Sequence, residues 1–326
     1  MHLSKIRLGI VGYGNLGRGV EKAISQNPDM ELVAVFTRRS PESIDTNATA
    51  VSMADIESYK GKIDVMLLCG GSATDLEKQG PEISKHFNTV DSFDTHAKIP
   101  EYFEMVDSSA KEGGNTSLIS TGWDPGLFSL NRLLGECVLP EGDEYTFWGK
   151  GVSQGHSDAI RRISGVKRGV QYTVPSEDAL STVRAGEKLD ISATDRHERV
   201  CYIVLEEGAD AASIEKEIVT MPNYFADYKT TVNFISEEEF QSEHTGMPHG
   251  GSVFRQGRTG EGTSQVIEFK LNLGSNPEFT SSVLVACARA VNRFASEGRV
   301  GALTVFDIPY AYLSPKSGAE LRKELL

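Results

Sequence analysis

The stretch IRLGIVGYGNLG, residues 6–17, decides the fold of the first part of the chain. Its apolar start predicts a buried strand, and three glycines follow in the pattern G-x-G-x-x-G. Gly12 allows a tight turn, Gly14 lets the backbone approach a pyrophosphate, and Gly17 lets the next helix pack closely on the strand. Glycine-rich turns also occur for structural reasons alone. The position directly after a first strand nevertheless favours a dinucleotide-binding unit, with the helix N-terminus facing the phosphates.

The residues after the second predicted strand, 31–36, distinguish between two dinucleotides. NAD-binding proteins usually carry Asp or Glu there, about 20 residues after the glycines, to hold the ribose 2′-hydroxyl. Here the sequence reads Thr37-Arg38-Arg39. Two guanidiniums and a hydroxyl suit the 2′-phosphate of NADP, and a carboxylate that would repel it is missing. The alternative is a solvated basic loop, but the position favours NADP.

Strand and helix patterns alternate through residues 1–122, which is typical of a doubly wound parallel sheet. Apolar residues recur at helical spacing from Ile99 to Ala110, and Gly113-Gly114 ends that pattern as a C-cap does. Further strands of this sheet are predicted at 63–69, 88–92 and 116–120.

The pattern changes from residue 123, where longer alternating strands predict a mostly antiparallel sheet covered by helices. These strands are expected at 145–148, 170–174, 200–206 and 266–273. A strong helix follows at 279–296, and such a helix commonly returns to the first sheet. We therefore expect a Rossmann-type α/β domain of residues 1–122 and 276–326, with an inserted α+β domain of residues 123–275.

Composition excludes several classes of protein. A net charge of −13 argues against a nucleic-acid surface and against anionic membranes, although a few arginines can still bind an anionic ligand. No apolar run reaches the roughly 18 residues of a membrane span. Residues 1–5 lead directly into the first predicted strand, so no signal peptide is expected. Four widely spaced cysteines predict reduced packing residues in a cytoplasmic protein: Cys69, Cys137, Cys201 and Cys287.

Further motifs resemble those of one enzyme family. They are STGWDPGLFSLNR from residue 120, TFWGKGVSQGHSDAIRRI from 146, TMPNYF from 220, HTGMPHGG from 244 and NPEFTSS from 276. With GYGNLGRGVE from 12 and CGGSATD from 69, they resemble the meso-diaminopimelate dehydrogenases of bacterial lysine and cell-wall precursor synthesis. The resemblance runs from the first strand to the last helix, and TGWDPG and GVSQGHSDA are specific to that family.

The resemblance implies a reaction and an assembly. Meso-2,6-diaminopimelate, NADP⁺ and water would give L-2-amino-6-oxopimelate, ammonia and NADPH. The protein would be a homodimer, and the inserted domain would bind the substrate and form the dimer. Another Rossmann-fold NADP-dependent D-amino-acid dehydrogenase is the nearest alternative.

The substrate carries an ammonium and a carboxylate at each end, so its site needs two clusters of anchors. Asp94 and Asp124 follow predicted strands and should lie at the carboxyl edge of the parallel sheet. By resemblance they hold the ammonium of the D-centre, and one of them accepts its proton; which one stays open. Asp124 could instead be only a turn residue before Pro125-Gly126.

The resemblance assigns the remaining site residues. A lone tryptophan is more often a core residue, but here Trp123 and Trp148 would wall the site. The residues expected near the D-carboxylate and the middle of the substrate are Gln154, Gly155 and Asp158. Those expected at the remote end, the L-centre that does not react, are Thr173, Arg199, His249 and Asn276. The guanidinium of Arg199 can bind a carboxylate at two points. The cofactor would contact Gly12, Tyr13, Gly14, Asn15, Leu16, Gly17, Thr37, Arg38, Arg39, Cys69, Gly70, Ser72, Ala73 and Thr74.

Three other interpretations compete. GVSQG from residue 151 matches the serine-hydrolase elbow G-x-S-x-G, with Ser153 as the nucleophile, but such folds do not open with a dinucleotide fingerprint. His244 and His249 lack the i, i+4 spacing of a helical zinc pair, so no metal is expected. A non-catalytic NADP sensor would keep residues 12–39 but would not need the polar cluster.

Overall fold

The structure, a computed structural model, describes residues 5–192 and 194–326. Residues 1–4, on which the expectation of no signal peptide partly rests, lie outside this range. The chain forms two compact units. Unit 1 comprises Met1–Leu130 and Pro277–Leu326, and unit 2 comprises Asn131–Asn276. Unit 1 therefore extends beyond residue 122, where the sequence predicted the boundary, and it includes both Trp123 and Asp124.

Unit 1 is built on a seven-stranded sheet with the order β14-β6-β5-β4-β1-β2-β3. All of its strand pairs are parallel. Its strands are β1 (Ile6–Val11), β2 (Met30–Thr37), β3 (Thr49–Ser52), β4 (Val65–Leu68), β5 (Thr89–Asp91), β6 (Thr116–Leu118) and β14 (Gly301–Leu303). The Rossmann-type fold class is thus confirmed. The short strands β3 and β14 were not predicted.

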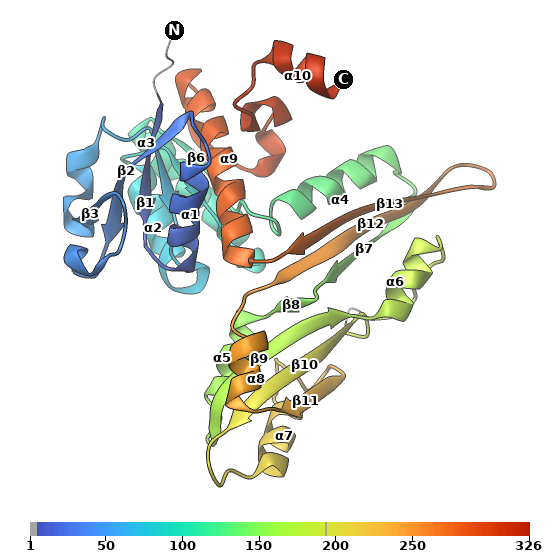
Figure 1. The fold of residues 1–326 in the computed structure, drawn as a ribbon. Helices are drawn as coiled ribbons and strands as arrows, with labels where there is room; N and C mark the ends of the chain where they lie inside the picture. The colour runs from blue at the N-terminus through green and yellow to red at the C-terminus, as the bar shows by residue number, and fades with distance from the viewer. Residues whose placement is uncertain (1–4, 193) are drawn as a thin grey trace. The chain divides into compact units, whose positions relative to one another are not determined.

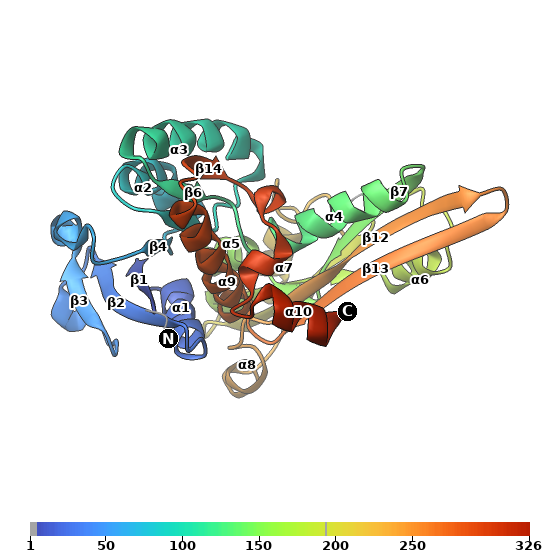
Figure 2. The same ribbon diagram turned by 90° about the horizontal axis from the view of Figure 1, so that it is seen from above.

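Helices cover both faces of this sheet (Figures 1 and 2). They are α1 (Asn15–Ser25) and α9 (Asn276–Ser296) on one face, and α2 (Glu77–Ser84) and α3 (Ile99–Gly113) on the other. Side chains alternate along β1, so Leu8 and Ile10 pack into the core with α1 and α9 while Val11 joins the core with α2 and α3. Gly114 ends α3 with a φ of 69°, which confirms the predicted C-cap. The last helix is α10 (Gly318–Leu325).

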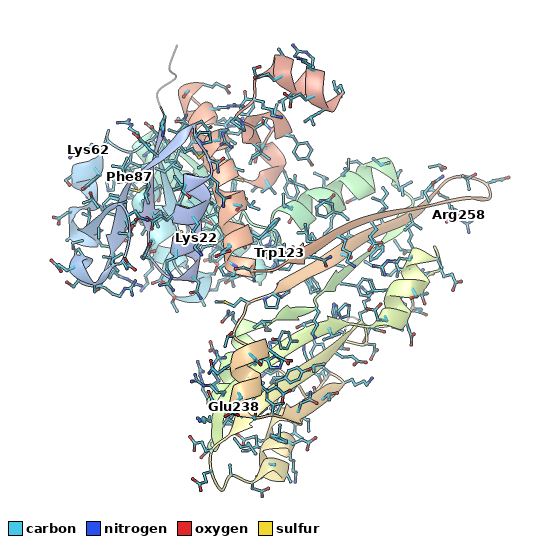
Figure 3. The ribbon with its side chains drawn as sticks, in the orientation of Figure 1. Lys22, Lys62, Phe87, Trp123, Glu238 and Arg258 are labelled. Atoms are coloured by element: carbon cyan, nitrogen blue, oxygen red, sulfur yellow. The ribbon has the colours of Figure 1, made fainter. Side chains whose placement is uncertain are left out.

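Unit 2 holds two sheets where the sequence predicted one. The first has the order β11-β10-β9-β8 and the second β13-β12-β7; among the described residues of this unit, only the β10–β11 pair is parallel. The strands are β7 (Gly142–Trp148), β8 (Gly151–Val152), β9 (Val166–Pro175), β10 (His197–Leu205), β11 (Thr230–Phe234), β12 (His249–Gly260) and β13 (Thr263–Leu273). Figure 3 labels Arg258 close to the outer end of the long β12–β13 hairpin.

The helices of unit 2 pack on these sheets. They are α5 (Gln154–Arg161), α6 (Glu177–Arg184), α7 (Ala211–Val219) and α8 (Glu237–Glu243), while α4 (Leu127–Val138) begins in unit 1 and ends in unit 2. Ile160 of α5 and Ile214 of α7 share a core with Ile203 of β10 and Phe225. Within the described ranges, no helix is long and apolar enough to cross a lipid bilayer.

A buried carboxylate joins two loops of unit 1. Asp91, at the end of β5, is 1% exposed. Its Oδ1 accepts hydrogen bonds from the amides of Phe93 and Ser120, each at 2.9 Å, and its Oδ2 accepts one from the Tyr102 hydroxyl at 2.7 Å. Burial raises the pKa of Asp91, and these three donors partly offset that effect. Asp91 thereby fixes the start of the loops that follow β5 and β6.

Replacing Tyr102 by phenylalanine should therefore destabilise unit 1. The buried Oδ2 of Asp91 would lose its donor, and an unsatisfied buried acceptor costs about 1–3 kcal/mol. Urea unfolding followed by circular dichroism measures the change. Tyr310→Phe is the control, because Tyr310 is 63% exposed and its variant should unfold as the parent does. Equal stabilities for Tyr102→Phe and the parent would contradict this account of Asp91.

Candidate active site

The glycine turn of unit 1 leaves a helix N-terminus open to an anion. Gly12 has a φ of 89°, and its amide donates to the Phe36 carbonyl at 2.9 Å. A Cβ on Gly17 would lie 2.2 Å from the Gly12 carbonyl oxygen, so this close crossing requires glycine. No side chain caps α1 at Gly14, and its first turn contains no acidic residue. The first N–H groups of α1 can therefore receive a phosphate.

A cavity of about 380 Å³ lies beside this turn. Eight of its lining residues belong to the predicted cofactor set: Gly12, Tyr13, Gly14, Thr37, Arg38, Arg39, Cys69 and Gly70. The other predicted residues do not line it: Asn15, Leu16 and Gly17 form the start of α1, and Ser72, Ala73 and Thr74 lie in the short helix Ser72–Leu76. Sequence reasoning missed Arg18, Met53 and Gln79, and left Asp75 out of its set.

The two arginines after β2 have different surroundings. Arg39 donates to the Tyr13 carbonyl at 2.8 Å, and its amide donates to Thr37 Oγ1 at 3.0 Å. Arg38 pairs with Asp75 at 2.7 Å, from Nη2 to Oδ1. Burial raises the pKa of Asp75, but the Gly71 amide, Thr74 and Arg38 together lower it by more. The pKa therefore lies below its ordinary value, and the carboxylate is charged.

This arrangement fits a 2′-phosphate, but the two arginines do not contribute equally. Asp75 reaches the end of β2 from another loop and neutralises Arg38, although no carboxylate follows β2 in the sequence. Among the described residues, no carboxylate pairs with Arg39. Arg39 and Arg18, which donates only to Asn15 Oδ1, therefore both bring positive charge to this cavity that no carboxylate of the described residues neutralises, and the residues present fit NADP.

The loops at the carboxyl edge of the same sheet bring the predicted acids of unit 1 close to Ser72 and Trp123. The Asp94 amide donates to Ser72 Oγ at 3.1 Å, so the loops after β4 and β5 meet. Asp94 is exposed and Asp124 is half-buried. Trp123 is buried and meets Phe128 edge-on with ring centroids 5.3 Å apart. Figure 3 labels Trp123 near the start of α9, where a Cβ on the adjacent Gly122 would approach Thr280.

Unit 2 brings three predicted residues of the remote end together. Thr173 of β9 lies opposite Arg199 of β10 and also opposite Gly151 of β8. Arg199 Nη1 donates to Thr173 Oγ1 at 2.6 Å. The ring of His249 packs on Gly151, where a Cβ would lie 2.4 Å from it. Burial lowers the pKa of His249, so its imidazole is neutral at pH 7.

Arg199 is a buried cation without a counter-ion. It is 8% exposed, and no carboxylate among the described residues pairs with it. Its Nε is buried and has no hydrogen-bond acceptor. Burial lowers the pKa of Arg199, but a guanidinium stays protonated at neutral pH. Such a group is stabilised by binding an anion, and its planar fork matches a carboxylate.

The other predicted residues of unit 2 lie on neighbouring segments. Gln154 Nε2 contacts Met247 Sδ at 2.9 Å, and the Asn276 amide donates to the Met247 carbonyl at 2.9 Å. Trp148 is 39% exposed, and its amide donates to His197 Nε2 at 2.9 Å. Gly155 is exposed at the start of α5, where Asp158 forms an ion pair with Arg161.

The hydrolase interpretation finds a serine–histidine contact but no triad. Ser153 Oγ lies 2.8 Å from His156 Nδ1. The other nitrogen of His156 lies 3.1 Å from the Tyr224 carbonyl oxygen rather than from a carboxylate. Burial, together with the nearby Arg199, lowers the pKa of His156 to about 4, which makes it a weak base at pH 7. Within the described part of the chain, no group of three or more His, Cys, Asp or Glu could hold a metal ion.

The sequence did not single out three residues that contact predicted site residues or their immediate neighbours. Asp91, at the end of β5, and Gln171, within β9, are buried polar residues in predicted strands, and that position is a usable signal because buried polar groups need partners. Met247 links Gln154 and Asn276 and gives no such signal. Its role depends on chain segments that meet only in the folded unit.

Comparisons with known proteins agree with this geometry. The family model described as Diaminopimelic acid dehydrogenase C-terminal domain matches residues 122–275. Meso-diaminopimelate D-dehydrogenase of Ureibacillus thermosphaericus is 64% identical over 326 residues, with 99% of this chain and 100% of that protein covered.

Two solved structures are also similar over 99% of this chain and 100% of theirs. An engineered D-amino acid dehydrogenase bound to NADP⁺ is 45% identical, with a TM-score of 0.85. A meso-dapdh of Clostridium tetani E88, 61% identical with a TM-score of 0.92, was solved with DAP as the variant Q154L/T173I/R199M/P248S/H249N/N276S. This chain therefore belongs to the meso-diaminopimelate dehydrogenase family.

Proposed function

We propose that this chain catalyses the reversible, NADP-dependent oxidative deamination of the D-centre of meso-2,6-diaminopimelate, in lysine and diaminopimelate biosynthesis. The products are ammonia, NADPH and L-2-amino-6-oxopimelate, which cyclises to tetrahydrodipicolinate. The buried guanidinium of Arg199 carries the proposal, because it offers a carboxylate anchor that a simple D-amino acid would leave empty. Family membership and the cavity beside Arg39 support it.

In unit 1 we assign Asp94 and Asp124 to the reacting end. Their carboxylates hold the ammonium of the D-centre, and one of them accepts its proton so that the amine lone pair is free. The Cα–H bond then breaks, its electron pair leaves as hydride, and water hydrolyses the resulting imine to the ketone and ammonia. NADP⁺, when bound, supplies the hydride acceptor. Trp123 helps to exclude bulk water while the hydride leaves, before the imine is hydrolysed.

In unit 2 we assign Thr173, Arg199, His249 and Asn276 to the remote L-centre, with Trp148, Gln154, Gly155 and Asp158 nearer the middle of the substrate. Arg199 and Thr173 already form a joined pair of donors for the remote carboxylate. The Clostridium tetani variant supports this assignment, because it is substituted at six positions where this chain has the same residue types.

We also assign a homodimer and a cytoplasmic location to this enzyme. The part of α4 in unit 2 exposes Leu133, Leu134 and Val138 by 42%, 51% and 56%. Such an apolar strip is typical of a protein–protein interface. Cys69, Cys137, Cys201 and Cys287 are all free thiols, as is usual in a reducing compartment.

The function is tested by offering the meso, LL and DD isomers of diaminopimelate separately and measuring NADPH formation. The meso isomer should react fastest. The LL isomer should be inert because it has no D-centre. The DD isomer should be slow because its remote end has the wrong handedness for Thr173, Arg199 and His249. A simple D-amino acid that reacts as fast as the meso isomer would favour the broader D-amino-acid dehydrogenase.

Cofactor choice should depend on Arg39 more than on Arg38. Removing a charge-assisted hydrogen bond costs about 1.5–3 kcal/mol, so Arg39→Ala should weaken NADP⁺ binding roughly 10- to 100-fold. Arg38→Ala should cost less, because Asp75 already neutralises Arg38. Titration of both cofactors against each variant gives the dissociation constants. Equal losses for NADP⁺ and NAD⁺ would show that the arginines serve the fold and not the 2′-phosphate.

The reacting end is tested by Asp94→Ala and Asp124→Ala. Each variant should lose at least about tenfold in kcat/KM for diaminopimelate, since each loses a hydrogen bond to a charged group. The affinity for NADPH should stay near that of the parent. Asp143→Ala is the matched control, because Asp143 is an exposed carboxylate on β7. A near-native rate in either active-site variant removes that residue from the assignment.

A further inference from the structure

Tyr228 covers one face of the Arg199 guanidinium. The Arg199 Cζ atom lies 3.9 Å from the centroid of the Tyr228 ring. Arg199 donates to Thr173 at one edge of the guanidinium, and its Nε has no acceptor. Burial lowers the pKa of Arg199, and the Tyr228 hydroxyl opposes part of that effect through its charge and a hydrogen bond. A ring at this distance attracts a cation through its negative face, and the attraction grows when water is excluded.

The segment that carries Tyr228 is held at several points. The Tyr228 amide donates to the Phe225 carbonyl at 3.0 Å, and Phe225 is fully buried. His156 bonds the Tyr224 carbonyl and meets the Phe225 ring edge-on with centroids 5.4 Å apart. The Arg199 amide donates to the Lys229 carbonyl at 2.9 Å. Tyr228 is therefore fixed against Arg199 by both its own segment and β10.

The other buried arginines show what is unusual here. Arg289 is 3% exposed and pairs with Asp29, with further acceptors on Asn27 and Leu313. Arg255 is 9% exposed and donates to two backbone carbonyls. The N–H donors of Arg289 and Arg255 are therefore used in hydrogen bonds within the protein. Arg199 has instead one hydroxyl acceptor and one aromatic face, which restrain the guanidinium without using its charge.

We propose that Tyr228 is a positioning residue for substrate specificity: its ring holds the Arg199 guanidinium in one plane, so that the remote carboxylate must bind edge-on. This inference rests on the proposed function, because it takes Arg199 as the anchor. The ring stabilises a cation that lacks a counter-ion before substrate arrives. It also blocks one face, which leaves the donor edge as the route for a carboxylate.

The test compares Tyr228→Leu, Tyr228→Met and Tyr228→Phe with Arg199→Met and the double variant Tyr228→Leu/Arg199→Met. Cation–π pairs are worth about 0.5–2 kcal/mol, with the upper end reached at desolvated sites, so loss of the ring should raise KM for diaminopimelate roughly 3- to 30-fold. The kcat should change less, and KM for NADP⁺ should not change. Phenylalanine should restore KM to within about threefold of the parent, because it keeps the ring.

The double variant shows whether Tyr228 acts through Arg199. Arg199→Met alone should lower kcat/KM for diaminopimelate by roughly 100-fold or more, the cost of a lost bidentate charge pair. Adding Tyr228→Leu should then change kcat/KM by less than about twofold, because the ring has no cation to hold. Tyr312→Leu is the matched control, since Tyr312 lies against Arg293 at 5.6 Å in unit 1, and it should leave KM for diaminopimelate unchanged.

Each outcome decides between the two proposals. If Arg199→Met has near-native kinetics, Arg199 is not the anchor and the proposed remote site fails. If Arg199→Met collapses while Tyr228→Leu and Tyr228→Met keep the parent KM, only the role of Tyr228 is overturned. A KM for Tyr228→Phe as high as that for Tyr228→Leu would also overturn it, because the hydroxyl would then matter and not the ring. Should Tyr228→Leu fail to fold, Tyr228→Met and Tyr228→Phe carry the same comparison.

Discussion

The parallel pairing of β1 with both β2 and β4 determines where chemistry can occur in unit 1. In a sheet whose strands all run one way, the carboxyl ends meet at one edge, and loops from distant parts of the sequence become neighbours. The glycine turn after β1, the arginines after β2 and the Cys69-Gly70 step after β4 consequently line one cavity. The loops with Asp94 and Asp124 leave the same edge, and Asp91 ties the starts of both loops together.

Unit 2 depends on a different constraint, the high cost of burying charge. Antiparallel pairing places Thr173 directly beside Arg199, and the Gly151 position beside Thr173 leaves room for the His249 ring. Arg289 is a buried charged group that the fold satisfies, through its ion pair with Asp29. Arg199 is restrained but not neutralised. This difference separates a binding group from a structural one, and residue type alone does not reveal it.

The serine-hydrolase interpretation does not hold at the second ring nitrogen of its histidine, where a catalytic triad would have a carboxylate. The elbow-like turn at GVSQG does place Ser153 beside His156, but His156 contacts a backbone carbonyl and sits near Arg199. That environment keeps the imidazole neutral, and the contact with the Tyr224 carbonyl ties the start of α5 to the segment bearing Tyr228. The serine–histidine contact thus serves the architecture around Arg199.

Local patterns in the sequence were sufficient for the fold class, the glycine turn, the α3 cap at Gly114 and the choice of NADP, because short-range periodicity and φ requirements act over a few residues. Tertiary structure decided the rest. The edge strands β3 and β14 were not recognised from the sequence, and the division of unit 2 into two sheets depends on long-range pairing. The Asp75–Arg38 pair and the Tyr228 ring over Arg199 join residues far apart in the chain. Their partners are set by packing and burial, which no local stretch encodes.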